Sequence, residues 1–201
     1  MSRKKYFQKL EHGTAYHIYN RGNNKENLFK NSNDYNYFLH LWVKYIEPIA
    51  DTYCYCLLPN HFHFFVRIRS IDEKEYKPAK QTRYIEQHFS NLFNAYAKTI
   101  NLVYNRTGSL FQERFRRKMI SDEQYFLKMV GYILTNPCKH RIRKSASDYP
   151  HSSYFCTFSK GPSFVRRDEV ISWFGGVRKL KEYLADYSHQ LEVENWMLEP
   201  E

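Results

Sequence analysis

The feature that most constrains this chain is the stretch of residues 61–68, HFHFFVRI, in which two kinds of side chain alternate. Successive side chains of a β-strand point to opposite faces of its sheet. One face of the stretch is therefore wholly apolar, with Phe62, Phe64, Val66 and Ile68. The other face carries His61, His63, Phe65 and Arg67. The pattern predicts a strand that is buried under helices on one side and presents two imidazoles on the other.

The segments around this strand predict the order of the other elements. Strands are expected over residues 15–21 and 51–58, and the turn at Pro59 and Asn60 joins the second of them to residues 61–68. After a polar cluster at 31–34 a helix is expected, which Pro48 closes, and a charged loop is expected over 69–81. Further along we expect a helix over 82–101, a basic strand over 110–120, and a helix over 121–135 that Pro137 ends.

Strand, helix, strand, strand, helix, strand is the split β-α-β order of ferredoxin-like folds. The predicted fold class is α+β, a ferredoxin-like antiparallel sheet with helices on one face and the helix 121–135 near the other face. Residues 1–158 are expected to form this domain. Residues 159–201 are expected to be a helical C-terminal extension, with short helices over 167–174 and 177–187.

The composition indicates a nucleic-acid partner. The 201 residues carry a formal net charge of +10, which attracts polyanions, and 18 Tyr and 15 Phe accompany the cations. Rings among Lys and Arg favour single-stranded nucleic acid, because rings stack on unpaired bases. An anionic membrane surface and a basic surface kept for solubility are the alternatives. No apolar run of membrane-spanning length or signal peptide is evident, so a cytoplasmic protein without a membrane partner is expected.

The two histidines are candidate metal ligands. Imidazoles at positions i and i+2 on one strand face can share a divalent metal ion, although many such pairs are ordinary polar residues on a half-exposed sheet. Helix 121–135 adds Tyr132 and Asn136, four residues apart, on one helical face. A phenol and an amide oxygen at this spacing can approach the same phosphate. The alternative for Tyr132 is a packed aromatic side chain whose hydroxyl bonds a neighbour.

Three separate blocks resemble one known family. They are residues 16–22 (YHIYNRG), 58–63 (LPNHFH) and 132–137 (YILTNP), and the element Ser152, Ser153 and Tyr154 follows downstream. In this order they resemble the single-tyrosine HUH transposases, and within them the REP-associated tyrosine transposases. The resemblance covers roughly residues 10–155. Cys138 stands where many relatives have valine, and we expect it to affect packing only.

The resemblance implies a transposase that cuts single-stranded DNA, including DNA with hairpins, and rejoins it. It implies Tyr132 as the nucleophile that forms a covalent 5′-phosphotyrosine. It also implies His61, His63 and Asn136 as ligands of a divalent metal ion, Mg²⁺ or Mn²⁺.

Candidate DNA contacts come from the basic residues near these motifs. Their alternative is a solvated charged surface. They lie on the predicted strand 110–120, on the tyrosine helix and just after it: Arg114, Arg116, Arg117, Lys118, Lys128, Lys139 and Arg141.

Several alternatives remain open from the sequence. The chain resembles a transposase, but a domesticated relative that binds nucleic acid without strand transfer would share its fold. A replication-initiator or relaxase nickase and a metal-dependent hydrolase are further rivals. The chain can act as a monomer or as a homodimer in which each tyrosine helix serves the partner's site.

Overall fold

The structure, a computed structural model, describes residues 8–70, 78–112, 114–120 and 122–193. Its strands form one antiparallel sheet in the order β2-β3-β1-β4. They are β1 (Ala15–Arg21), β2 (Ala50–Leu58), β3 (His61–Ile68) and β4 (Arg116–Ile120). The helices are α1 (Ser32–Tyr45), α2 (Pro78–Val103), α3 (Glu123–Lys139), α4 (Tyr154–Phe158), α5 (Arg167–Trp173) and α6 (Val177–Val193). This strand order and connectivity confirm the predicted ferredoxin-like fold.

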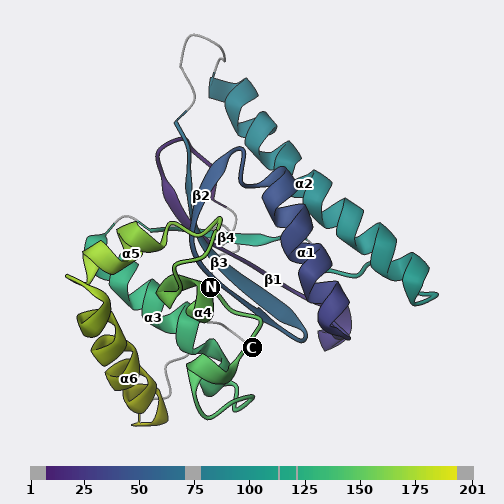
Figure 1. Cartoon of the computed structure of the whole chain (residues 1–201). Helices are drawn as coiled ribbons and strands as arrows, with labels where there is room; N and C mark the ends of the chain where they lie inside the picture. Colours follow the sequence, from purple (N-terminus) through teal and green to yellow (C-terminus); the bar gives the residue numbers. More distant parts are fainter. Residues whose placement is uncertain (1–7, 71–77, 113, 121, 194–201) are drawn as a thin grey trace.

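Helices α1 and α2 cover one face of the sheet, and the other helices lie on the opposite side (Figure 1). The apolar face of β3 packs under α1 and α2, as its alternation predicts, and Phe62, Phe64, Val66 and Ile68 are fully buried there. The Trp42 ring from α1 stacks on Phe64 with centroids 3.5 Å apart. Helix α1 begins with a capping box, in which the side chains of Asn31 and Asp34 each accept a backbone N–H of the other.

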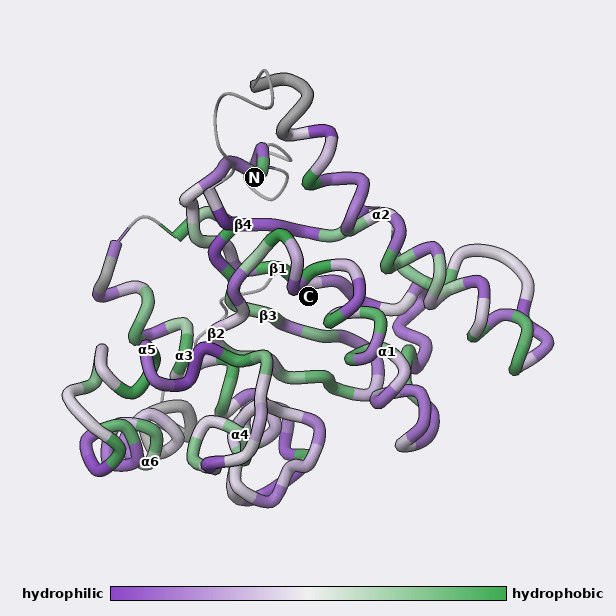
Figure 2. The backbone as a smooth tube through the Cα atoms, turned by 45° about the horizontal axis from the view of Figure 1, so that its top comes forward, coloured by the Kyte–Doolittle hydropathy of each residue, from purple (hydrophilic) through white to green (hydrophobic). Residues whose placement is uncertain are grey.

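The histidine face of the sheet is covered by the helix that the sequence predicts near it. Helix α3 packs over β2 and β3, and α6 packs on α3. A second apolar core forms between them, with Phe65, Met129, Ile133, Val170 and Leu184 all buried. Figure 2 shows hydrophobic stretches along β2 and β3, whereas β4 is mostly hydrophilic. The apolar side chains of α3, α5 and α6 are removed from water when they pack against β2 and β3, and this burial stabilises the arrangement.

The extension after residue 158 packs on the same core. Its bridge from Val165 to Thr52 continues the edge of β2, and the Arg166 guanidinium lies 2.7 Å from the Asp51 carboxylate. Before it, the Ser153 hydroxyl accepts the backbone N–H of Tyr55 at 2.9 Å, which fixes α4 to β2. The boundary at residues 158 and 159 stays a prediction. Residues 194–201 of the predicted extension and 71–77 of the predicted loop lie outside the described residues.

Three predicted boundaries are wrong. Helix α2 begins at Pro78, inside the predicted loop 69–81. The predicted strand 110–120 is broken: Phe111 makes an isolated bridge to Gly22, Arg114 has a left-handed φ of 57°, and β4 begins only at Arg116. Helix α3 continues through Pro137 to Lys139. A proline removes one helical hydrogen bond, but this proline lies in the last turn, where buried neighbours hold the backbone.

Gly131 permits the close packing of α6 on α3. A Cβ at this position would lie 2.8 Å from Cδ2 of Tyr187 and 2.9 Å from Cε1 of Tyr183. We expect Gly131→Ala to lower the free energy of unfolding by about 1–3 kcal/mol, because ring overlap outweighs the better helix propensity of alanine. Thermal unfolding followed by circular dichroism measures the change. Gly161→Ala is the control, since a Cβ there meets no described atom within 4 Å. Equal melting temperatures for the two variants would contradict the predicted contact.

Candidate active site

Four histidines gather on the α3 side of the sheet. His61 and His63 come from β3, His17 from β1, and His140 directly follows α3. Nε2 of His17 lies 3.0 Å from Nδ1 of His63, a hydrogen-bond distance. The ring of His61 lies 5.1 Å from that of His63 and 4.7 Å from that of His140, between centroids. Within one subunit, two neighbouring strands and the end of α3 therefore bring these imidazoles together.

Tyr132 lies against this group. Its ring from α3 meets the His63 ring edge-on at 5.4 Å and the His17 ring at 5.9 Å, between centroids. The Lys139 ammonium lies 4.7 Å from the centroid of the Tyr132 ring. The side chain of Tyr132 is only 1% exposed. The late tyrosine and the early histidine pair thus adjoin, but the phenol is enclosed in the core.

Asn136 lies one helical turn after Tyr132 and is fully buried. Its Nδ2 donates to the Tyr132 carbonyl at a long 3.5 Å. Among the described residues, its Oδ1 and the Nε2 of His61 are buried without a hydrogen-bond partner. Buried polar atoms without partners are uncommon and call for an explanation, such as a bound ion.

Asn60 orients His61. Nδ1 of His61 lies 2.6 Å from Oδ1 of Asn60, which can only accept, so Nδ1 carries the proton and donates. The lone pair of His61 is therefore on Nε2, the buried atom. A ligating histidine in proteins has the same arrangement, with its other nitrogen donating to an oxygen.

Burial keeps these imidazoles neutral. Burial, together with nearby positive charge such as that of Lys139, lowers the pKa of His17 to about 3 and that of His61 to about 3. Burial likewise lowers the pKa of His140 to about 4 and that of His63 well below its usual range. Neutral imidazole is the form that binds metal ions.

The chemical types of the candidate donors suit a divalent cation. In the part of the chain that the structure describes, no three His, Cys, Asp or Glu side chains are arranged to hold a metal ion. His61, His63 and Asn136 offer imidazole nitrogens and an amide oxygen, which suit Mn²⁺ and similar ions.

The predicted DNA contacts divide between the two faces of the sheet. Arg116 and Lys118 of β4 pair with Tyr19 and His17 of β1, so they lie on the same face as the histidines. Lys118 donates to the Tyr125 hydroxyl at 2.6 Å. Lys139 lies beside Tyr132, whereas Lys128 on α3 and Arg141 after it are exposed.

Arg114 and Arg117 lie away from the histidine face of the sheet. Arg117 pairs with Glu86 of α2 on the opposite face, and Arg114 precedes β4 on that side. The prediction that Arg114 lies on the fourth strand is wrong, because the chain turns at its left-handed φ.

Sequence reasoning assigned no role to His17, Tyr19 and Arg21, which share the histidine face with His63 and His61. The alternation of residues 15–21 carried the necessary signal, since every second residue of that strand points the same way.

The chain is similar to known proteins both in sequence and in fold. Over 107 residues, 52% of this chain, the sequence is 26% identical to a protein of Haemophilus influenzae that carries the provisional name REP-associated tyrosine transposase. The matched segment spans 58% of the length of that relative. The fold is similar to that of a REP-associated tyrosine transposase bound to a REP hairpin, with a TM-score of 0.55 and 20% identity, over 82% of this chain and 88% of the other. No protein-family model matches the chain.

The chain therefore shares the fold of a solved REP-associated tyrosine transposase. The resemblance to the REP-associated tyrosine transposases that the three sequence blocks indicate is confirmed in sequence and in fold. Across the described ranges, no helix is both long and apolar enough to cross a bilayer.

The unsatisfied oxygen of Asn136 predicts an unusual stability change. Replacing a buried polar group that lacks a partner by an apolar group of similar shape is neutral or stabilising. We expect Asn136→Leu, without added metal, to unfold at the same or a higher temperature than the wild type. Thr135→Val is the control, because the Thr135 hydroxyl donates to the Gly131 carbonyl at 2.7 Å. That variant should lose about 1 kcal/mol. A larger loss for Asn136→Leu than for Thr135→Val, in denaturant melts, would show that the amide is satisfied.

Proposed function

We propose that this chain is a transposase that cuts and rejoins single-stranded DNA through Tyr132. The observation that carries the proposal is the contact of the Tyr132 ring with His63 and His17, next to the unpartnered polar atoms of His61 and Asn136. The solved relative is bound to a REP hairpin. By analogy, the substrate proposed for this chain is DNA that contains a hairpin.

His61, His63 and Asn136 would hold the divalent ion, Mg²⁺ or Mn²⁺. A cation at this position offsets the negative charge that grows on the scissile phosphate. Asn60 contributes by keeping the His61 lone pair on Nε2.

Tyr132 supplies the nucleophile. Its hydroxyl oxygen forms a bond to phosphorus, the bond from phosphorus to the 3′-oxygen breaks, and that oxygen leaves as a 3′-hydroxyl after gaining a proton. The phenol gives up its own proton, and the Lys139 ammonium 4.7 Å from the ring centroid favours the resulting negative charge. The 5′-phosphotyrosine conserves the bond energy, so a second 3′-hydroxyl can reverse the step onto a new strand.

DNA would enter along the β1 and β4 side of the sheet, next to the part that α3 covers. Arg21, Arg116 and Lys118 are half-buried there and share the histidine face. Because Tyr132 is 1% exposed, a phosphate reaches it only after α3 moves relative to the sheet. That movement is part of the proposal.

The enclosed phenol also favours a second candidate function. A protein that binds hairpin DNA without cutting it has no need of an accessible nucleophile. The two candidates differ in whether a covalent adduct forms, and not in whether DNA binds.

Tyr132→Phe tests the chemistry. Incubated with hairpin-containing single-stranded DNA and Mn²⁺, the wild type should form a protein–DNA adduct that survives denaturing gels. The variant should lose it by at least about a thousandfold, because no other group replaces the nucleophile. Tyr125→Phe on the same helix should retain the adduct. An adduct in Tyr132→Phe would refute Tyr132 as the nucleophile. If neither protein forms an adduct but both bind DNA, the second candidate function, binding without cutting, is favoured. Free 5′-phosphate without an adduct would indicate a hydrolase.

A thermal shift tests the metal ligands independently of cleavage. Mn²⁺ at about a hundred times its Kd should stabilise the wild type by about 2.7 kcal/mol. His61→Ala should abolish most of this shift, whereas His40→Ala on the exposed side of α1 should keep it. The melting temperature of each protein is measured with and without Mn²⁺. An equal shift in both variants would exclude His61 as a ligand.

A further inference from the structure

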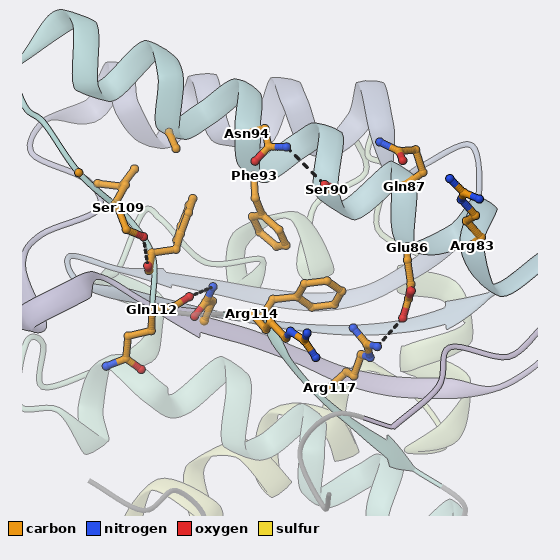
Figure 3. A pocket seen from close by; sticks show the side chains of 16 residues that line it. Arg83, Glu86, Gln87, Ser90, Phe93, Asn94, Ser109, Gln112, Arg114 and Arg117 are labelled. Atoms are coloured by element: carbon orange, nitrogen blue, oxygen red, sulfur yellow. Dashed lines mark hydrogen bonds and ion pairs between the residues drawn. The ribbon is translucent and has the colours of Figure 1, made fainter. Parts of the chain in front are cut away.

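A groove lies on the side of the sheet away from Tyr132, between α2 and the segment that leads into β4. Its volume is about 760 Å³, within the range of small-ligand sites. Figure 3 shows Phe93 extending from α2 into the groove, with Arg114 below it. None of the site residues proposed for catalysis lines it.

The lining of the groove combines three kinds of side chain. The lining contains three arginines and one glutamate, so its net charge is positive. Arg117 is paired with Glu86, and this leaves Arg83 and Arg114 as exposed cations at the rim. The rings of Phe93 and Phe115 line the groove with centroids 5.2 Å apart. Phe93 is buried, and the half-buried Phe115 ring stacks on Phe89. The amides of Asn94 and Gln112 lie among them.

The backbone at this point is strained. Arg114 adopts a φ of 57°, which side chains other than glycine and asparagine rarely take. On one side of it, the Gln112 N–H donates to the Arg21 carbonyl at 2.9 Å, and on the other, β4 begins at Arg116. The chain is thus held at both ends while Arg114 turns outward. Strain of this kind gathers at functional sites, where surrounding structure maintains it.

We infer that this groove binds one or two unpaired nucleotides of the DNA, as a second contact separate from the Tyr132 site. The exposed part of the Phe115 ring can pack on a base that has no paired neighbour. The amides can hydrogen-bond base edges, and the rim arginines can meet phosphates. Duplex DNA fits poorly because its base faces are already stacked. The inference rests on the DNA-binding part of the proposed function and requires no cleavage.

The topology connects the two contacts. β4 is the edge strand of the sheet, with Arg116 and Lys118 on the Tyr132 face and Arg117 on the groove face. A single strand that passes around this edge touches both faces. Such a path of the DNA would explain why the basic residues of β4 are divided between the two faces.

Equilibrium binding tests the inference in a Tyr132→Phe background without metal, so that failure of cleavage cannot affect the result. The probes are a fluorescent thymidine homopolymer and a blunt-ended hairpin with the same number of phosphates, in which a polyethylene glycol linker replaces the loop nucleotides. We expect the double variant Arg83→Gln/Arg114→Gln to bind the homopolymer about tenfold more weakly and with a shallower salt dependence. Its affinity for the blunt hairpin should change by less than about twofold. The control is Lys98→Gln/Arg178→Gln, which removes two exposed charges outside the groove.

Phe115→Leu tests the stacking, because it retains apolar volume but removes the ring. It should also weaken homopolymer binding by about tenfold and leave hairpin binding unchanged. Circular dichroism melts verify that each variant folds. The inference is overturned if the arginine variant binds the homopolymer as tightly as its parent, or if the control loses as much affinity. It is also overturned if the affinity falls equally for both probes, or if Phe115→Leu has no effect.

Discussion

The packing of α3 across β2 and β3 is the interaction on which the site depends. Without it the imidazoles of β3 would lie on a wetted sheet surface and titrate near their usual pKa. With it, burial lowers the pKa of His61 to about 3 and leaves its Nε2 without a hydrogen-bond partner among the described residues. The apolar residues of α3, together with those of α5 and α6, supply the free energy that keeps these polar atoms buried.

This arrangement has a cost in stability. An unpartnered amide oxygen and an unpartnered imidazole nitrogen raise the free energy of the folded protein. The same packing encloses Tyr132, so the contacts that assemble the site also close it to DNA. Access to the phenol and the stability of the α3 layer are therefore linked, and α6 strengthens the link by packing on the outer side of α3.

The edge strand β4 has the opposite character. It is short, basic and hydrophilic (Figure 2), and its side chains alternate between the two faces of the sheet. Cationic edge strands resist pairing with other sheets. In this chain Arg116 and Lys118 lie on the histidine face, and Arg117 lies on the groove face, where it pairs with Glu86.

The sequence by itself determined the sheet topology, the apolar face of β3 and the start of α1, because side-chain alternation and capping are local properties. It also placed the tyrosine and histidine motifs in an order that resembles a known family. Only the tertiary structure decided that α3 continues through Pro137, that Arg114 turns out of the strand, that His17 and His140 join the histidine pair, and that the phenol is enclosed. These outcomes depend on contacts between segments far apart in the chain, where burial and packing outweigh local preference.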